Sequence, residues 1–150
     1  MTSCPSPSPR PRALIVEDEI IIALALETDL NELGFDTCGL VADAREALSI
    51  AMDDRPDIAV IDIYLNGARD GIETARMLRE LCNVPIVFVT AYSDEEGILE
   101  RIERQVPGAP ILTKPLYGHR LADAIAKVAQ AAPLRKAQRA APGLTVAAAH

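Results

Sequence analysis

The sequence predicts an α/β fold, a doubly wound, five-stranded parallel sheet with strand order 2-1-3-4-5. Short apolar runs alternate five times with segments of helical periodicity, and this alternation implies right-handed crossovers with helices on both faces of the sheet. The length of 150 residues suits one domain. The composition, with 49% hydrophobic and 25% charged residues, is typical of a globular protein.

Local signals place the individual elements in chain order. Gly34 ends the first helical segment, and Asp43–Glu46, Asp70–Glu73 and Ser93–Glu96 have the spacing of capping boxes that open the next three helices. The strands consist of short runs rich in β-branched residues. Strands are expected over residues 13–16, 35–41, 57–63, 84–89 and 109–113, and helices over residues 19–33, 43–54, 70–82, 93–105 and 116–130.

The strand order follows from the composition of the runs. Residues 13–16, 58–61 and 86–89 are continuously apolar, as central strands of a parallel sheet are. The run at 35–41 contains polar residues, and Pro110 lies near the start of the last strand. Both features favour edge strands, where a missing backbone donor does least harm. Three central and two edge strands match the order 2-1-3-4-5.

Both ends of the chain are expected to lie outside the folded body, which spans residues 13–131. Residues 1–12 are rich in proline and predict a disordered tail, and residues 132–150 predict a flexible, alanine-rich tail. The two tails together hold five basic residues and no acid, so the net charge of −7 implies a charge of −12 on the body. The acidic body, and the low aromatic content of 3% for the whole chain, argue against nucleic acid as a partner.

Cysteine usage and hydropathy bear on the cellular compartment. Cys4, Cys38 and Cys82 are widely spaced and form no CxxC pair, which argues against a disulfide framework or a zinc site. No apolar run approaches the ~18 residues of a membrane span. We therefore expect a cytoplasmic protein without a membrane partner.

Polar residues follow four of the five expected strands. Glu17 and Asp18 follow the first strand, Asp62 ends the third, Thr90 follows the fourth and Lys114 follows the fifth. Ligands of doubly wound sheets bind at this edge. Each residue alone is typical of a helix cap or a turn, but their coincidence at four strand ends predicts a site. Three close carboxylates repel one another and favour a hard cation such as Mg²⁺. A carboxylate beside Mg²⁺ and a lysine can attack a phosphoryl donor and form an acyl phosphate.

These residues, in this order on five βα units, resemble the receiver domain of bacterial two-component response regulators. The resemblance covers about residues 12–130 and implies a flavodoxin-like fold. It implies that Asp62 is the phospho-acceptor and that Lys114 binds the phosphoryl group. It also implies a Mg²⁺ site formed by Glu17, Asp18, Asp62 and the backbone carbonyl of Tyr64.

The resemblance also implies a switch, and here the sequence departs from the common pattern. Thr90 would be the switch hydroxyl, but Ile111 stands where the family often has tyrosine or phenylalanine. The loop after Asp62 is one residue longer than the commonest receiver spacing and lacks the usual proline. The bond between Lys114 and Pro115 is expected to be cis, as in the family.

The expected function is that of a single-domain response regulator. It would take a phosphoryl group from a sensor histidine kinase or a phosphotransfer protein and signal to a downstream protein by contact. It would not be an enzyme beyond its own phosphorylation and dephosphorylation. A homodimer would use the face of the fourth helix, fifth strand and fifth helix. The alternatives are a phosphate shuttle or sink, a degenerate receiver without Mg²⁺, and a phosphohydrolase with an aspartyl nucleophile. The phosphohydrolase is disfavoured because Tyr64 stands where such enzymes carry a second aspartate.

Overall fold

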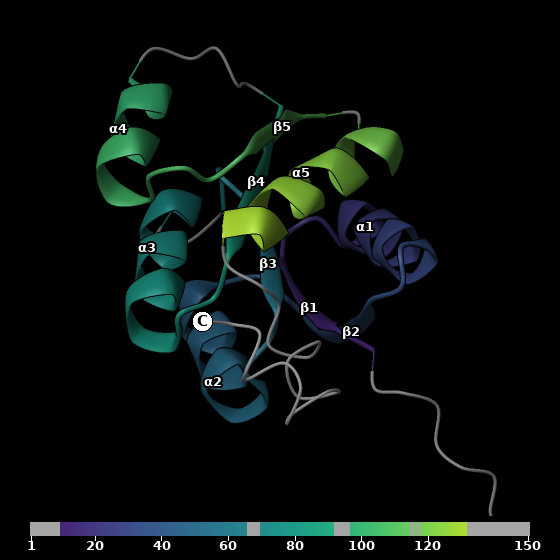
Figure 1. Ribbon diagram of the computed structural model, residues 1–150. Helices are drawn as coiled ribbons and strands as arrows, with labels where there is room; N and C mark the ends of the chain where they lie inside the picture. The colour runs from purple at the N-terminus through teal and green to yellow at the C-terminus, as the bar shows by residue number, and fades with distance from the viewer. Residues whose placement is uncertain (1–9, 66–69, 92–96, 115, 117, 132–150) are drawn as a thin grey trace, which may run out of the picture.

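The computed structural model describes residues 10–65, 70–91, 97–114, 116 and 118–131 (Figure 1). The five strands are parallel and lie in the order β2-β1-β3-β4-β5, so the predicted fold class and strand order are confirmed. The strands are β1 (Arg12–Val16), β2 (Asp36–Val41), β3 (Ile58–Asp62), β4 (Ile86–Thr90) and β5 (Ile111–Thr113). The helices are α1 (Ile20–Glu32), α2 (Ala44–Asp54), α3 (Gly71–Cys82), α4 (Ile98–Gln105) and α5 (Gly118–Ala131).

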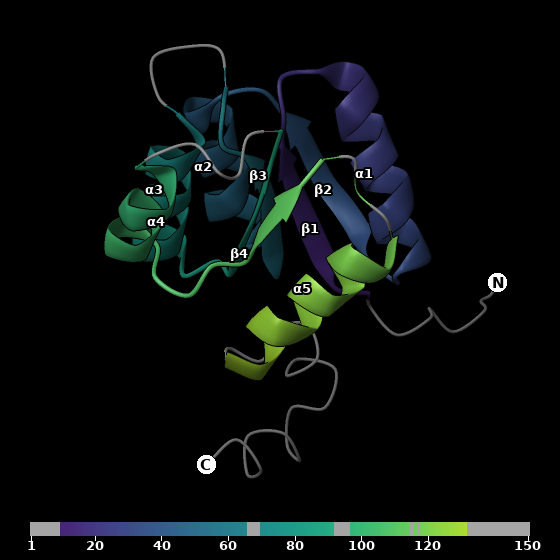
Figure 2. The ribbon, with the colours of Figure 1, turned by 90° about the horizontal axis from the view of Figure 1, so that it is seen from above.

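Helices cover both faces of the sheet. Figures 1 and 2 show α1 and α5 on one face and α2, α3 and α4 on the other. Successive residues of β1 belong to different cores: Leu14 and Val16 pack with the α2–α4 side, and Ala13 and Ile15 pack with α1 and α5. This alternation follows from the pleat of a strand, and it explains why the central strands have no polar face.

Two predicted helix starts are confirmed at the level of individual hydrogen bonds. The Asp43 carboxylate accepts from the backbone N–H of Glu46 at 2.9 Å, and the Asp70 carboxylate accepts from that of Glu73 at 2.9 Å. Each bond satisfies a donor that the first helical turn would otherwise leave unpaired. The spacing of acids in the sequence therefore determines where α2 and α3 begin.

The predicted start of the fourth helix is wrong. A helix was expected from Ser93, but α4 begins at Ile98, directly after Gly97. Gly97 has a φ of 88°, and a right-handed helix cannot pass through that left-handed conformation. Ser93–Glu96 themselves lie outside the described residues.

Two strands are shorter than predicted because of proline. The strands expected from residues 84 and 109 begin at Ile86 and Ile111, directly after Pro85 and Pro110. A proline has no N–H to donate to the ladder. Its carbonyl still accepts: Pro85 accepts from Ala59 and Pro110 from Phe88, both at 2.9 Å.

Several predictions fall outside the described residues. They concern the two tails (residues 1–9 and 132–150), most of the loop after Asp62 (residues 66–69) and the isomer of the Lys114–Pro115 bond. Within the described part of the chain, no helix combines the length and the apolar character that crossing a bilayer requires.

The start of α3 lies directly against the end of β3. The backbone N–H of Gly71 donates to the carbonyl of Ile63 at 2.8 Å. A Cβ atom at position 71 would lie 1.9 Å from the backbone oxygen of Asp62. Glycine is therefore required at position 71 for steric reasons, and the helix end helps to hold the backbone of Asp62 in place.

We predict that Gly71→Ala destabilises the protein by about 3 kcal/mol or more, because backbone atoms must move apart to admit the methyl group. Gly108→Ala is the matched control. Gly108 has a φ of 81° with open space around it, so alanine there should cost only about 1–2 kcal/mol. Urea unfolding of both variants measures the difference. Equal losses would show that the contact between Gly71 and Asp62 is unimportant.

Candidate functional site

The register of the strands brings the predicted residues to one edge of the sheet. Val16 pairs with Ile61, so the next residues along, Glu17 and Asp62, are neighbours across the two strands. Thr90 pairs with Thr113 at the ends of β4 and β5. The chain then continues to Lys114, whose backbone N–H donates to the Thr90 carbonyl at 2.8 Å. The structure therefore brings these strand ends together at one edge of the sheet.

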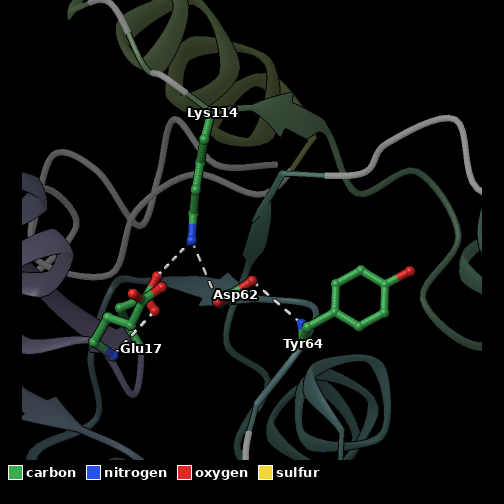
Figure 3. Close-up of polar contacts among 5 residues, drawn as sticks. Glu17, Asp62, Tyr64 and Lys114 are labelled. Atoms are coloured by element: carbon green, nitrogen blue, oxygen red, sulfur yellow. Dashed lines mark hydrogen bonds and ion pairs between the residues drawn. The ribbon is translucent and has the colours of Figure 1, made fainter.

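Lys114 bridges two of the carboxylates. Its Nζ lies 3.0 Å from Oε1 of Glu17 and 3.3 Å from Oδ2 of Asp62 (Figure 3). The carboxylates are almost completely buried, and the lysine side chain is 17% exposed. In this poorly solvated setting, each charge depends on its partners for stabilisation.

The remaining carboxylate oxygens accept from the backbone. Oε2 of Glu17 accepts from the N–H of Glu19 at 3.2 Å, and Oδ1 of Asp62 accepts from the N–H of Tyr64 at 3.2 Å. The Tyr64 ring extends away from the lysine (Figure 3). Both acids are therefore held from two sides, which fixes the direction in which Asp62 presents its carboxylate.

The electrostatics of the site reflect burial first and neighbouring charges second. Burial raises the pKa of Glu17 to about 7, helped by the charge of Asp62 and opposed by hydrogen bonds from Lys114 and the Glu19 backbone. Burial lowers the pKa of Lys114, but its contacts with Glu17 and Asp62 outweigh burial, so the net shift is upward. The lysine therefore stays charged, whereas Glu17 is held poorly as an anion in the absence of a further cation.

The acids fit a metal ion. Glu17, Asp18 and Asp62 each offer a carboxylate oxygen, and these atoms lie within 4.8 Å of one another. A set made of carboxylate oxygens only suits a hard cation such as Mg²⁺, and a second positive charge would relieve the repulsion that Lys114 leaves. The half-exposed position of Tyr64, next to Asp62, is compatible with its predicted role as a carbonyl ligand.

The two predicted switch residues lie on neighbouring strands. Thr90 is fully buried at the end of β4, one residue beyond the partner of Asp62. Ile111 is half-buried at the start of β5, opposite Phe88, and packs against the core on the α2–α4 side. Thr90 therefore lies beside the acids. Ile111 lies level with Ile61, one residue before Asp62 along the strands.

An apolar groove adjoins the site, and the sequence analysis missed it. It has a volume of about 480 Å³ and lies between α1 and the chain that follows β5. Its lining includes Lys114, so the groove and the acidic site share a side chain. The lining residues are Ile21, Ile22, Ala25, Leu26, Asp29, Lys114 and Leu116. Ile20 and Leu24 are further exposed apolar residues of α1. The available signal was the pair Ile20 and Ile21, two exposed isoleucines at the start of α1 that lie off its buried stripe.

Two further polar contacts were also missed. Nη2 of Arg101 on α4 lies 2.6 Å from Oδ2 of Asp70. Asp57, which is buried just before β3, accepts from the N–H of Arg12 at 2.8 Å. Both contacts join residues distant in the sequence, so no local pattern announces them.

The family model described as "Response regulator receiver domain" matches residues 13–126. The DNA-binding response regulator MtrA of Mycolicibacterium paratuberculosis is 36% identical over 94 residues, covering 63% of this chain and 41% of the relative. The transcriptional regulatory protein PdtaR of Mycobacterium tuberculosis is 35% identical over 104 residues, covering 69% and 49%. The chain thus matches less than half of each relative's length.

Solved structures agree. The signal receiver domain of a modulated diguanylate cyclase from Desulfovibrio desulfuricans superposes with a TM-score of 0.74 at 37% identity, covering 87% of this chain and 99% of that one. A response regulator receiver protein from Sinorhizobium medicae gives 0.69 at 29% identity, covering 81% and 96%.

The raised pKa of Glu17 predicts a dependence of stability on pH in metal-free buffer. A buried acid whose pKa rises from 4.5 to about 7 contributes full stability below pH 4.5 and loses it as the pH rises through 7. Glu17→Gln carries no charge, so its free energy of unfolding at pH 8 should exceed that of the wild type by about 1–2 kcal/mol, or about 2–8 °C in Tm. The gap should close at pH 5.

Thermal melts in a chelator at both pH values measure this effect. Glu32→Gln, which removes the same charge from an exposed position on α1, is the control and should leave Tm unchanged. A Glu17→Gln protein less stable than the wild type at pH 8 would contradict the assignment.

Proposed function

The chain belongs to the response regulator receiver family, and from this premise we propose that Asp62 accepts a phosphoryl group from a phosphohistidine protein with the help of Mg²⁺. The observation that carries the proposal is the placement of Asp62 between Lys114 and the Tyr64 N–H, beside Glu17 and Asp18. In the transfer, the P–N bond of the donor breaks and a bond forms between phosphorus and an oxygen of Asp62.

The position of each residue in the site determines the role that we propose for it. The contacts from Lys114 and Tyr64 orient the Asp62 carboxylate toward the open edge of the sheet. Lys114, bound to Asp62 in the resting protein, is placed to stabilise negative charge on the phosphoryl oxygens. Glu17, Asp18, Asp62 and the carbonyl of Tyr64 would hold Mg²⁺, which would neutralise charge on the transferred group. Thr90 would donate a hydrogen bond to it.

The family is one of signalling domains, so we place this protein in signalling rather than metabolism. We also propose that the protein catalyses its own phosphorylation and dephosphorylation, is located in the cytoplasm, and acts as a regulator rather than as a phosphate shuttle or sink. We further propose that it contacts a downstream protein and forms a homodimer through α4, β5 and α5. The relative MtrA is a DNA-binding response regulator, but the acidic charge of this chain does not support nucleic acid as a partner.

The groove beside α1 supports a protein as the phosphoryl donor. The exposed fraction of Ile21 is 79%, and this side chain lines a groove that also contains Lys114. A donor histidine must reach Asp62 past this lysine, so the surface of the donor around that histidine would lie on α1. An exposed apolar surface next to a reaction site favours a protein partner over a small phosphate ester.

Mg²⁺-dependent labelling tests the proposed reaction. We predict that acetyl phosphate adds one phosphoryl group to the wild type in Mg²⁺ and none in a chelator, because the clustered acids repel an unshielded phosphate. Asp62→Asn should abolish the mass increase, and Asp53→Asn, an exposed change on α2, should preserve it. Labelling of Asp62→Asn, or labelling that ignores Mg²⁺, would refute the site.

A second prediction separates the docking of the donor from the chemistry. Ile21→Ser should slow phosphotransfer from purified histidine kinases of the source organism about tenfold, which corresponds to about 1.4 kcal/mol of lost contact. Labelling by acetyl phosphate should be unchanged, because this small donor does not use the groove. Leu81→Ser removes a comparably exposed apolar side chain, 68% against 79% for Ile21, from the far end of α3 and is the matched control. Equal rates for both variants and the wild type would remove α1 from the interface.

A further inference from the structure

One carboxylate, that of Asp70, joins α3 to α4. Its Oδ1 accepts from the N–H of Glu73 at 2.9 Å and caps α3, while Oδ2 binds Nη2 of Arg101 at 2.6 Å. The two side chains are about one-third exposed, so water weakens the pair only in part. Because the cap fixes the carboxylate on α3, Arg101 attaches α4 to a defined point of the structure.

That point touches the phospho-acceptor. Gly71 follows Asp70, donates its N–H to the Ile63 carbonyl at 2.8 Å, and has no room for a Cβ because the backbone oxygen of Asp62 fills the space. Arg101, Asp70, Gly71 and Asp62 therefore form an unbroken series of direct contacts. A displacement of the Asp62 backbone would reach α4 through two contacts and one peptide unit.

Among the described residues, few other contacts determine where α4 lies. The helix has eight residues, begins after Gly97 without a hydrogen bond from a capping side chain, and buries only Ile98 and Ile102. A helix this short is unstable by itself, so its position depends on its tertiary contacts. The Arg101–Asp70 pair is the most specific of these, since ion-paired hydrogen bonds are directional and isoleucine packing is not.

An alternative route by which a change at the acidic site could reach the surface of α4, β5 and α5 runs through β5. This route is poorly suited to a large movement. Ile111 lies at the first position of the strand, half-buried and packed against the core. A β-branched side chain has one preferred χ1 rotamer and sweeps little volume. The strand thus offers no large ring that could change places when Thr90 moves.

We propose that Arg101 is a positioning residue that couples α4 to the phospho-acceptor through the Asp70 carboxylate. The proposal rests on the proposed function, since it concerns how phosphorylation of Asp62 is sensed. Phosphorylation moves the chain after Asp62, the cap at Asp70 moves with α3, and Arg101 carries the change into α4. By reciprocity, a partner that holds α4 in its shifted position favours the phosphorylated state.

The test uses the full chain and beryllofluoride with Mg²⁺ as the phosphoryl mimic. Amide chemical shifts of Ile98–Gln105 and of residues 59–63 are recorded before and after addition. The test variants are Asp70→Asn, which keeps an effective helix cap without the charge, Arg101→Gln, the double variant, and Arg101→Lys as the conservative change. Arg104→Gln removes the same group from an exposed position on α4 and is the matched control.

In the wild type, we expect both sets of amides to shift. In Asp70→Asn and Arg101→Gln, the amide shift changes in α4 should fall below about half of the wild-type values. The shift changes at residues 59–63 should stay at the wild-type values. The double variant should lose no more than either single change, because both remove the same pair. Arg101→Lys should restore part of the response, and Arg104→Gln and Ile111→Val should retain it. A loss of stability alone would not produce this pattern.

The outcomes separate the two proposals. Wild-type protein that gives no shift with beryllofluoride and Mg²⁺ would refute the proposed function and the coupling with it. Normal shifts at 59–63 with an undiminished response of α4 in Arg101→Gln would overturn the coupling alone. An equal loss in Arg104→Gln, or a loss confined to Ile111→Val, would also overturn it, by assigning the effect to general charge or to β5.

Discussion

The repulsion among three carboxylates at one edge of the sheet is the constraint on which the site depends. The carboxyl ends of parallel strands lie at the same edge of a sheet, so Glu17, Asp18 and Asp62 lie close together there. Lys114 neutralises part of this charge by bridging Glu17 and Asp62. Burial, together with the nearby charge of Asp62, still raises the pKa of Glu17. The site is thus built to gain stability from an added cation, and a phosphate approaches it more easily once that cation is bound.

Steric contact holds the backbone of Asp62 in place, and the charged groups around it surround its carboxylate. The missing side chain at Gly71 lets α3 begin against the backbone of Asp62, and the cap at Asp70 ties down the first turn. A catalytic group held by packed backbone keeps its geometry better than one on a free loop. The same contact makes α3, and whatever α3 holds, sensitive to events at Asp62.

The surfaces proposed for receiving and for reporting the signal lie on opposite faces of the sheet. The groove on α1 reaches Lys114 from one face, and Arg101 on α4 reaches the backbone of Asp62 through Asp70 and Gly71 from the other. Figures 1 and 2 show these helices separated by the strands. In the proposed function, a donor on α1 would leave α4 free for another protein, which suits phosphorylation followed by recognition.

The sequence by itself determined the fold class, the strand order, the starts of α2 and α3 and the residues at the strand ends. These depend on local patterns: apolar runs, an acid three residues before a helical N–H, and the rule that parallel strands end together. The tertiary structure alone decided that Lys114 bonds to Glu17, 97 positions away, and that Arg101 bonds to Asp70, 31 positions away. It also decided that α4 begins only after Gly97, that Ile21 borders the site, and that position 71 admits no Cβ. Such contacts form where separate elements pack together. Two side chains that meet over so long a sequence separation produce no periodic pattern that the sequence alone could reveal.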